Sequence, residues 1–574
     1  MSVTRTVWEL SVVDDALVRR LANECSISTA LSRVLTTRGI TDPDHVRAFL
    51  NPGLNQFHDA FLLPDMDQAA RRLARAVAEG QHIRIYGDYD VDGITSVSLL
   101  VSVLRAAGAV VDYHIPNRLI EGYGLNADAV ARCAEEGVGL LITVDCGIGA
   151  FEEVALAGSL GVDVIITDHH EAGQEVPACA GVIDPKRLDS VYPFPGLAGV
   201  GVAFKLAMAF WSLTDRRAPE ADPTNYLDLV TLGTVADVVP LVDENRVIVS
   251  HGLAMMGSTR NPGIQSLIDV ADLGGRDLKA GHISFSLGPR VNAAGRLGDP
   301  SLGAKLFLTS CEQEAANLAR MLDDENRRRQ EIESEILRQV WEPVSKMNTR
   351  TTRAIVLGSQ NWHSGVIGIV ASKIAELTYR PTVLVAFEGD IGRGSARSIP
   401  GFNLYSALTE CSDLLVKYGG HAQAAGLSIK ADDLDALRER LNRLGHEWLS
   451  EQDLAPKMRV DAELSEDEIT IELARELSQL EPFGLGNPTP VFVSRHMLVL
   501  ESKAVGAEGR HLKLKLGRGH RIIDGIGFRM AGRYSSLAKT AAEVDVAYSL
   551  EINEWNGRVA AELNLKDIAE SEGV

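Results

Sequence analysis

The sequence predicts an α/β protein with four parts: a parallel-sheet domain, a long connecting helix, a second α/β domain and a C-terminal β-rich domain. Three observations carry this prediction. Apolar strand-like runs alternate with helical stretches from about residue 82; residues 312–340 are highly charged and contain neither Gly nor Pro; and short apolar runs separated by turns fill the chain after residue 456. A chain of 574 residues is also too long for a single hydrophobic core.

The first 80 residues are expected to be mainly helical, with turns at 51–53 and 63–64. The first sheet follows. Its expected strands are 83–87, 110–115, 139–144 and 162–167, and its clearest helices are 94–107 and 126–136. Apolar strands that alternate with helices indicate a parallel sheet covered on both faces.

The charged stretch 312–340 predicts one helix on the order of 40 Å long, which could join two domains. A surface helix packed on the first domain is the alternative. Strands at 354–358 and 382–387 flank a helix near 365–377, and glycine-rich turns are expected at 392–394 and 419–420. The final strands suggest a small barrel or sandwich. The expected boundaries are 1–310, 311–348, 349–455 and 456–574.

Bulk composition is that of an ordinary soluble protein, with 45% hydrophobic and 24% charged residues. The formal charge of −21 argues weakly against nucleic acid, but residues 501–533 carry eight basic and three acidic side chains, a local excess of five. No signal-peptide pattern or membrane-spanning stretch is present, and the six cysteines form no CxxC pair. These features predict a cytoplasmic protein, with Cys146 acting as a small buried hydrophobe.

Three aspartates at alternate positions, Asp88, Asp90 and Asp92, directly follow an apolar run. In an extended chain they would share one face, where cations would have to neutralise them. The motif also resembles the start of a calcium-binding loop, but that loop needs a glutamate at its twelfth position, where this chain has Leu99. An acidic surface turn is the other alternative, and the flanking glycines disfavour it.

Further candidate ligands follow two other strands: Asp145 comes after 139–144, and Asp168, His169 and His170 come after 162–167. Ligands of parallel sheets bind at the carboxyl ends of the strands, so these groups should meet. Asp237 follows an apolar helical run and is either a ligand or a helix cap. Imidazole among carboxylates favours Mn²⁺, with Mg²⁺ as the alternative. Two such ions would support in-line hydrolysis at phosphorus.

The series of motifs resembles the DHH phosphoesterase family, and within it the RecJ-like single-strand-specific 5′→3′ DNA exonucleases, over nearly the whole chain. The stretches that carry the resemblance are GDYDVDG (87–93), IPNRLIEGYGL (115–125), VDCGIG (144–149), TDHH (167–170), GLAGVGVAFKL (196–206), RVNAAGR (290–296), WHSGVIGIVASKI (362–374), GSARSIPGFNL (394–404), YGGHAQAAGL (418–427) and PFGLGNPTPVF (482–492). The resemblance implies a DHH catalytic domain, a DHH-associated domain and an OB-type nucleic-acid-binding domain.

The resemblance also implies roles for individual residues. Asp145 would bridge two metal ions, Asp88 would orient the motif, and His170 would contact the scissile phosphate. The implied metal ligands are Asp90, Asp92, Asp145, His169 and Asp237. The implied substrate-binding residues are Arg118, Tyr123, His170, Arg296, Ser395, Arg397, Gly419, Gly420, His421, Lys513 and Lys515. Ordinary salt bridges for the arginines and a core position for Tyr123 are the alternatives.

The function that follows from the resemblance is degradation of single-stranded DNA, 5′→3′, to mononucleotides by two-metal hydrolysis in recombination and repair. A helicase and a single-strand-binding protein are expected partners, and a monomer is the expected state. Two alternatives stay open. One is a small-substrate phosphodiesterase of the oligoribonuclease or pyrophosphatase type, and the other is a catalytically silent replication scaffold on the same fold.

Overall fold

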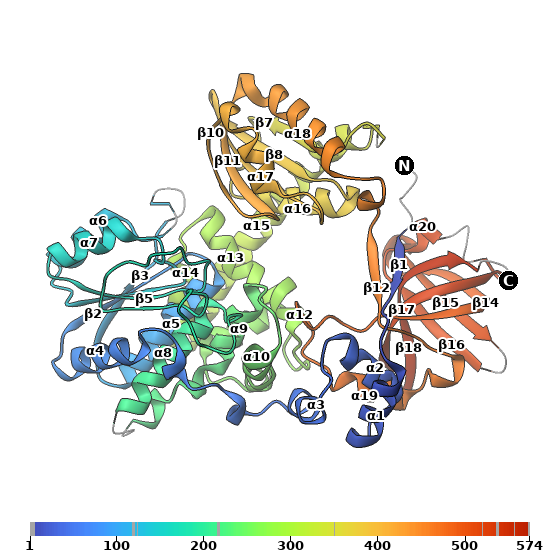
Figure 1. Cartoon of the computed structure of the whole chain (residues 1–574), viewed down its shortest axis with the longest axis horizontal. Coiled ribbons are helices and arrows are strands. Elements are labelled where there is room, and N and C mark those ends of the chain that lie inside the picture. Colours follow the sequence, from blue (N-terminus) through green and yellow to red (C-terminus); the bar gives the residue numbers. More distant parts are fainter. Residues whose placement is uncertain are drawn as a thin grey trace. The chain divides into compact units, whose positions relative to one another are not determined.

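The computed structural model describes residues 6–117, 121–122, 124–214, 218–348, 350–518, 521–534, 539–555 and 557–571. These residues form two compact units, each described here by itself (Figure 1). One consists mainly of Asp323–Met458 with Arg296–Gly298, and the other of Glu9–Gly295, Asp299–Leu322 and Arg459–Val574. None of the described helices combines the length and the apolar character needed to cross a bilayer.

A parallel sheet with strand order β3-β2-β4-β5-β6 lies in the larger unit, as expected. Its strands are β2 (His82–Gly87), β3 (Val110–His114), β4 (Leu140–Val144), β5 (Asp163–Thr167) and β6 (Gly181–Ile183). Alternate side chains serve opposite faces: Ile83 and Ile85 join one hydrophobic cluster, whereas Tyr86 joins another. Helices α4 (Met66–Ala78), α5 (Val91–Ala106) and α8 (Gly199–Leu213) cover the first face, and α6 (Ala127–Glu135) and α7 (Phe151–Ser159) the second.

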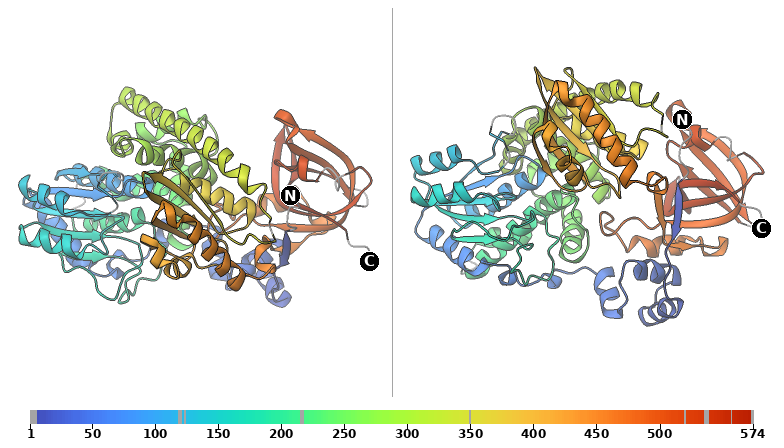
Figure 2. Two further views of the ribbon diagram at one scale, coloured as in Figure 1. Left: turned by 90° about the horizontal axis from the view of Figure 1, so that it is seen from above. Right: turned by 45° about the horizontal axis from the view of Figure 1, so that its top comes forward.

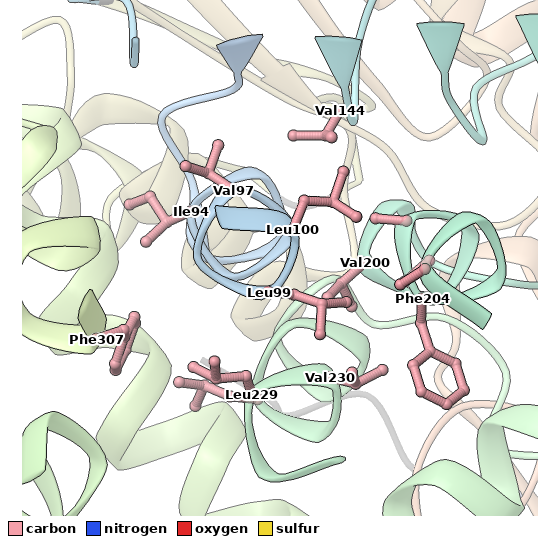
Figure 3. Packing of buried hydrophobic residues seen from close by; sticks show 14 of the residues in the cluster. Ile94, Val97, Leu99, Leu100, Val144, Val200, Phe204, Leu229, Val230 and Phe307 are labelled. Atoms are coloured by element: carbon pink, nitrogen blue, oxygen red, sulfur yellow. The ribbon is translucent and has the colours of Figure 1, made fainter. Parts of the chain in front are cut away.

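Helix α5 is the centre of the main core, and Figure 3 shows side chains from the sheet and several helices packed around it. Its hydroxyl groups are also buried. Thr95, Ser96 and Ser98 each donate a hydrogen bond to a carbonyl one turn earlier, at 2.8, 2.7 and 2.7 Å. Because these polar groups are satisfied locally, the helix can be buried on nearly every side.

Helices complete this part of the unit. They are α9 (Leu227–Ala236), α10 (Asp243–Met256), α11 (Pro262–Val270), α12 (Ala280–His282), the π-helical turn Ile283–Leu287, α13 (Gly288–Leu297) and α14 (Ser301–Leu308). The predicted long helix follows as α15 (Glu312–Val344), visible as one long helix in Figure 2. Its residues up to Leu322 belong to the larger unit and those from Asp323 to the smaller one, so it connects the two.

The smaller unit contains a mixed sheet with strand order β10-β11-β9-β8-β7. Its elements are β7 (Ile355–Ser359), α16 (Ile367–Thr378), β8 (Thr382–Glu388), β9 (Ile391–Arg397), α17 (Leu404–Thr409), β10 (Leu415–Gly420), β11 (Ala424–Lys430) and α18 (Leu434–Trp448). The glycine-rich turn expected at 392–394 is wrong, because these glycines lie inside β9, whereas Gly419 and Gly420 end β10 directly before a turn. A Cβ on Gly392 would stand 2.4 Å from Val385 Cγ1, so this glycine serves close packing rather than a turn.

The C-terminal strands close into a barrel, because β14 pairs with both β15 and β17 in the strand order β14-β15-β16-β18-β17. The strands are β14 (Phe492–Val505), β15 (His511–Arg518), β16 (Arg521–Gly527), β17 (Glu543–Trp555) and β18 (Arg558–Glu570). Along β15, Leu512, Leu514 and Leu516 are buried, because alternate side chains of a strand point to the same face.

The N-terminal helices share the hydrophobic core of this barrel rather than that of the first sheet. They are α1 (Asp15–Cys25), α2 (Thr29–Thr37) and α3 (Pro43–Leu50), and α2 packs on α19 (Ile471–Ser478) beside the barrel (Figure 1). Ser28 N–H donates to Glu476 at 2.6 Å, and Thr37 donates to Asp461 at 3.0 Å. The expected grouping of residues 1–310 as one domain did not anticipate this long-range packing.

Candidate active site

The aspartates of the first motif lie just past the end of β2, as expected, but they do not share one face of an extended chain, because α5 begins within the motif. Strand β2 ends at Gly87 and α5 begins at Val91, so the chain turns within the motif. Asp90 is the N-cap of α5: its Oδ1 accepts hydrogen bonds from the N–H groups of Asp92 and Gly93 at 3.0 and 3.2 Å. The start of the helix therefore fixes both side chains, with Asp90 at the N-cap and Asp92 in the first turn of α5.

The candidate ligands from separate strand ends meet in one place, as expected. His169 Nε2 lies 3.1 Å from Asp145 Oδ1, 3.8 Å from Asp92 Oδ2 and 3.7 Å from Asp237 Oδ2. Among the described residues, three groups have ligand atoms within 4.8 Å of one another: Asp92–His169–Asp237, Asp88–Asp90–Asp145 and Asp145–His169–His170. Asp145 and His169 each belong to two of them, and of the two only the Asp145 carboxylate has two oxygens that neighbouring ions could share.

The N-terminus of α8 holds Asp92 in place. Gly199 and Val200 donate their N–H groups to the two carboxylate oxygens of Asp92, at 2.6 and 2.8 Å. A helix N-terminus favours negative charge, which explains how a fully buried carboxylate is held there. A Cβ on Gly199 would stand only 2.7 Å from Asp145 Cβ and 2.8 Å from Asp92 Oδ2, so only glycine fits.

Asp168 organises the site without belonging to any of these ligand groups, and the sequence did not identify this role. Its Oδ2 accepts a hydrogen bond from Ile148 N–H at 2.9 Å, which ties the loop after β4 to the loop after β5. Its Oδ1 accepts from the N–H of His169 at 2.8 Å and lies 2.7 Å from His170 Nδ1. Asp145, the first residue of the loop after β4, has a left-handed backbone with φ 59°. This conformation is uncommon outside glycine and typical of functional sites.

Asp237 confirms the helix-cap alternative weighed from the sequence, and its position is also compatible with the ligand alternative. It is the C-cap of α9, and it lies in the group with Asp92 and His169. A helix C-terminus disfavours negative charge. Its Oδ2 atom is buried and accepts no hydrogen bond from the described residues, so a bound cation would compensate it.

Burial and mutual repulsion shift the acid–base equilibria of these groups. Burial, with a contribution from Asp90, raises the pKa of Asp92 to about 7. Burial and Asp92 raise the pKa of Asp237 to about 9, and they also raise that of Asp145. Burial and the neighbouring His170 lower the pKa of His169 to about 4, so its imidazole is neutral. Carboxylates crowded in this way and a neutral imidazole are the donor set of a divalent cation site.

His170 differs from His169 because it faces solvent. Its side chain is 46% exposed, whereas that of His169 is 9% exposed. Burial alone would lower the pKa of His170, but the hydrogen bond with Asp168 raises it. Burial alone would raise the pKa of Asp168, but His170 and the backbone N–H groups lower it. Asp168 therefore orients a histidine that can carry a positive charge at the mouth of the site.

Three predicted substrate-binding residues gather in the smaller unit near the N-terminus of α16. Arg296 donates from Nη1 to the carbonyl of Gly365 at 3.1 Å. Ser395 and Arg397 lie on the same face of β9, with Arg397 Nη1 3.1 Å from Ser395 Oγ. A Cβ built on Gly368 would stand 2.9 Å from Ser395 Oγ and 3.3 Å from Arg397 Nη2. Two guanidinium groups and a helix N-terminus form a donor set suited to phosphate.

The other predicted residues of this unit lie at a hairpin. Gly419 and Gly420 end β10, and exposed His421 begins the turn into β11, with its N–H bonded to Ala424 O at 2.9 Å. Gly420 has φ 136°, and a Cβ there would meet Ala424 O at 2.5 Å, so the tight turn requires glycine. Arg118 and Tyr123 lie outside the described residues.

Lys513 and Lys515 project from β15 as predicted, but the expected local charge excess is largely compensated. Lys513 pairs with Glu562 on β18, and Lys515 lies 3.0 Å from Glu501, which also contacts Lys503 at 2.5 Å. The count over 501–533 omitted Glu562 because strand pairing brings it in from far along the chain.

Comparisons with known proteins cover the same regions. The family model for the DHH family, N-terminal domain, matches residues 82–234, that for the DHHA1 domain matches 351–447, and that for the RecJ OB domain matches 460–567. The single-stranded-DNA-specific exonuclease RecJ of Bacillus subtilis strain 168 is 38% identical over 576 residues, which cover 100% of this chain and 72% of the relative. The Escherichia coli K12 protein of the same name is 37% identical over 88% of this chain and 90% of its own length.

A solved structure supports the same grouping. The crystal structure of RecJ from Thermus thermophilus in complex with Mn²⁺ is 32% identical, with a TM-score of 0.85 over 99% of this chain and 80% of that one. The Mg²⁺ complex from the same organism gives a TM-score of 0.79. The identity over the full length, the order of the matched domains and the clustered ligand residues agree. The chain belongs to the RecJ family of single-stranded-DNA-specific exonucleases, within the DHH family.

Proposed function

We propose that this chain degrades single-stranded DNA from the 5′ end to mononucleotides, by hydrolysis at two divalent metal ions. The observation that carries the proposal is the meeting of Asp92, Asp145, His169 and Asp237 from separate strand and helix ends. The proposal also includes a role in DNA recombination and repair and a monomeric state. It further includes work alongside a helicase and a single-strand-binding protein.

The donor set fits two ions. Asp92, His169 and Asp237 would hold one, Asp90 would contribute to the other, and Asp145 would serve both. Mixed oxygen and nitrogen ligands favour Mn²⁺ at the histidine position, with Mg²⁺ as the alternative. When bound, the ions would activate water and neutralise charge on the phosphodiester. Asp88 would orient the motif, and His170, held by Asp168, would donate a hydrogen bond to the scissile phosphate.

The remaining residues would handle the DNA. Arg296, Ser395 and Arg397, with the N-terminus of α16, form a donor set suited to a terminal 5′ phosphate. The hairpin at His421 would contact the adjoining nucleotide. Arg118 and Tyr123 would contact the strand that enters the site. Lys513 and Lys515 would bind the DNA farther away. The proposed boundaries are 1–310, 311–348, 349–455 and 456–574, with the connecting helix in the second segment.

The two alternatives are less well supported. A small-substrate phosphodiesterase has no need of the barrel that the RecJ OB model matches at residues 460–567. A silent scaffold has no need of buried carboxylates gathered within 4.8 Å of an imidazole.

The Asp145→Asn variant tests the metal role, because an amide replaces one carboxylate oxygen and removes the negative charge that both ions would share. Hydrolysis of a single-stranded oligonucleotide should fall at least about 10³-fold with Mn²⁺ and with Mg²⁺, while the circular dichroism spectrum is kept. The measurement is release of mononucleotides from oligonucleotides blocked at the 5′ or the 3′ end. Activity near that of the unchanged protein would remove the bridging role. Degradation that a 5′ block leaves intact would contradict the polarity.

A further inference from the structure

A loop next to the barrel packs against residues 240–242, which follow Asp237 closely in the chain. This loop, residues 482–490 with the sequence PFGLGNPTP, is called the 482–490 loop. Leu241 N–H donates a hydrogen bond to the carbonyl of Leu485 at 2.7 Å. A Cβ on Gly484 would stand 2.6 Å from Leu241 Cδ1, so the Leu241 side chain packs on the loop backbone as closely as glycine allows. Since Leu241 follows Asp237 by four residues, the loop contacts the segment that leaves the candidate metal site.

The loop has a defined shape because Asn487 holds it from inside. The Asn487 side chain is fully buried and donates to the carbonyls of Leu480 and Pro482 at 2.7 and 2.8 Å. Backbone bonds between Gly484 and Asn487, at 2.9 and 3.1 Å, close the turn. Arg38, from the N-terminal helices, donates to Asn487 Oδ1. Every side-chain donor and acceptor of Asn487 is therefore used.

Arg246 fastens the base of the loop to α10. Its buried guanidinium donates to the carbonyls of Leu480 and Gln479 at 2.8 and 3.0 Å, and to that of Phe49 at 2.7 Å. The guanidinium also lies 3.9 Å from the centroid of the Phe49 ring. These contacts are all made within the larger unit. They join α10, the loop and the N-terminal helices at one residue.

The segment 238–241, which leads from Asp237 to the contact with the loop, has a strained backbone and is held by hydrogen bonds. Val238 has φ 61°, a left-handed conformation that β-branched residues adopt only when their surroundings enforce it, and its side chain is 61% exposed. Asn245 donates to the carbonyls of Pro240 and Gly196 at 3.0 and 2.6 Å. Gly196 precedes the α8 terminus that holds Asp92. The Leu241–Leu485 bond lies next to the Asn245–Pro240 bond, so the two bonds together hold the residues that follow Val238.

We propose that the 482–490 loop is a positioning element for the metal site: it holds the strained Val238 turn, and thereby keeps Asp237 where it binds the cation. The barrel then contributes to metal affinity, in addition to any contact with DNA. This inference rests on the proposed function, because it takes Asp237 to be a metal ligand.

Two variants test the proposal from different sides. Gly484→Ala pushes the loop away from Leu241, and Asn487→Ala removes the bonds that shape it. Gly532→Ala is the matched control, because Gly532 lies in the short helix α20 (Ala531–Tyr534) beside the barrel, with nothing within 4 Å of the added Cβ. Mn²⁺ binding to each full-length protein would be measured by electron paramagnetic resonance of the free ion. The KM for a long oligonucleotide would be measured separately, at saturating Mn²⁺.

Both test variants should bind the Asp237-dependent Mn²⁺ about 10-fold more weakly, as is typical when groups that support a metal ligand are removed. The KM for DNA should stay unchanged, and Gly532→Ala should match the original protein. Unchanged Mn²⁺ affinity with a lower melting temperature would mean that the loop only stabilises the fold, which overturns the proposal. A raised KM with unchanged Mn²⁺ affinity would overturn it too. Absence of Mn²⁺ binding to the original protein would instead defeat the proposed function.

Discussion

Gly199 lies so close to Asp92 and Asp145 that a single methyl group should disturb the site. A Cβ at this position would stand 2.7–2.8 Å from both side chains. Because Gly199 N–H also holds Asp92 at 2.6 Å, Gly199→Ala should displace a ligand and weaken Mn²⁺ binding about 10- to 100-fold. Titration of metal-free protein with Mn²⁺ measures this effect. Gly158→Ala is the matched control, because its Cβ would meet nothing within 4 Å, and it should bind Mn²⁺ normally.

The acid–base state of the metal ligands predicts how stability depends on pH. The folded pKa of Asp237, about 9, lies far above its ordinary value, so at pH 7 the metal-free folded state holds a proton that the unfolded chain lacks. This contribution to stability is present at low pH and is lost as pH rises towards 9, by at most about 1.4 kcal/mol per pH unit. His169 has a lowered pKa and acts in the opposite direction, but only between about 4 and 6.5.

The melting temperature of metal-free protein should therefore fall between pH 7 and 8.5, and Mn²⁺ should raise it more at pH 8 than at pH 6.5, because the ligands bind as anions. Differential scanning fluorimetry at matched ionic strength measures both effects. Asp237→Asn should flatten the fall and reduce the Mn²⁺ effect. A melting temperature that rises with pH in metal-free protein would contradict the assignment of these shifts.

Some residues of the candidate site could be predicted from the sequence, and others could not. Asp88, Asp90, Asp92, Asp145 and His169 could be predicted, because strand ends of a parallel sheet converge and carboxylates there need cations. Other contributors could not. Asp168 shares a motif with His169, but its role depends on the Ile148 N–H, whose position follows from the fold. Gly199 matters only because α8 packs against the β4 end, a contact between residues 54 positions apart.

At the level of elements, the two lysines of β15 depend on their strand neighbours. Glu501 on β14 holds Lys515 at 3.0 Å, and Glu562 on β18 pairs with Lys513. DNA must compete with these carboxylates. Lys513→Ala with Lys515→Ala should weaken binding of long single strands only several-fold and reduce the salt slope by about 0.7 for each phosphate that is no longer neutralised.

Glu501→Gln should strengthen the binding of long single strands, because it releases Lys515 for the phosphate backbone. Fluorescence anisotropy with a long and a very short oligonucleotide at several salt concentrations separates the outcomes. Equal losses on both lengths would place the lysines near the cleavage site instead of on an outlying path. A Glu501→Gln variant that binds more weakly would rule out a direct role of Lys515.

The helices and strands were the easiest part of the structure to predict, and the exception concerns glycine. Strands β2 to β5 follow from their local apolar runs, and helix α15 follows from a charged stretch that contains neither Gly nor Pro. The turns expected at 392–394 failed, because glycine there fits against Phe387 and Val385 on the neighbouring strand. Local sequence cannot distinguish a glycine needed for a turn from one needed for close packing.

At the scale of the whole molecule, the barrel depends on helices from the other end of the sequence. Leu31, Val34 and Leu35 of α2 are completely buried in the core shared with the barrel, and such burial contributes about 1.5–3 kcal/mol for each large side chain. The isolated fragment 456–574 should therefore be unstable. A fragment in which residues 11–52 are joined to its C-terminus by a flexible linker should melt cooperatively at a clearly higher temperature.

Circular dichroism melting and amide proton dispersion of the two fragments measure this difference. A control fusion in which Leu31 and Leu35 are both replaced by Asp should behave like the bare fragment. If the bare fragment melted as sharply and at the same temperature as the fusion, the helices would be an appendage of the barrel rather than part of its core.

The sharing of one core by the two ends of the chain has a consequence for biosynthesis. Leu21, Leu31 and Leu35 leave the ribosome among the first residues, but their packing partners, such as Leu464 and Leu514, are translated more than 400 positions later. At about 5–20 residues per second, the nascent amphipathic helices wait roughly 20 to 100 seconds before they can be covered. During that interval they are natural clients for trigger-type chaperones and natural targets for proteases, so the rate of translation should influence the yield of native enzyme.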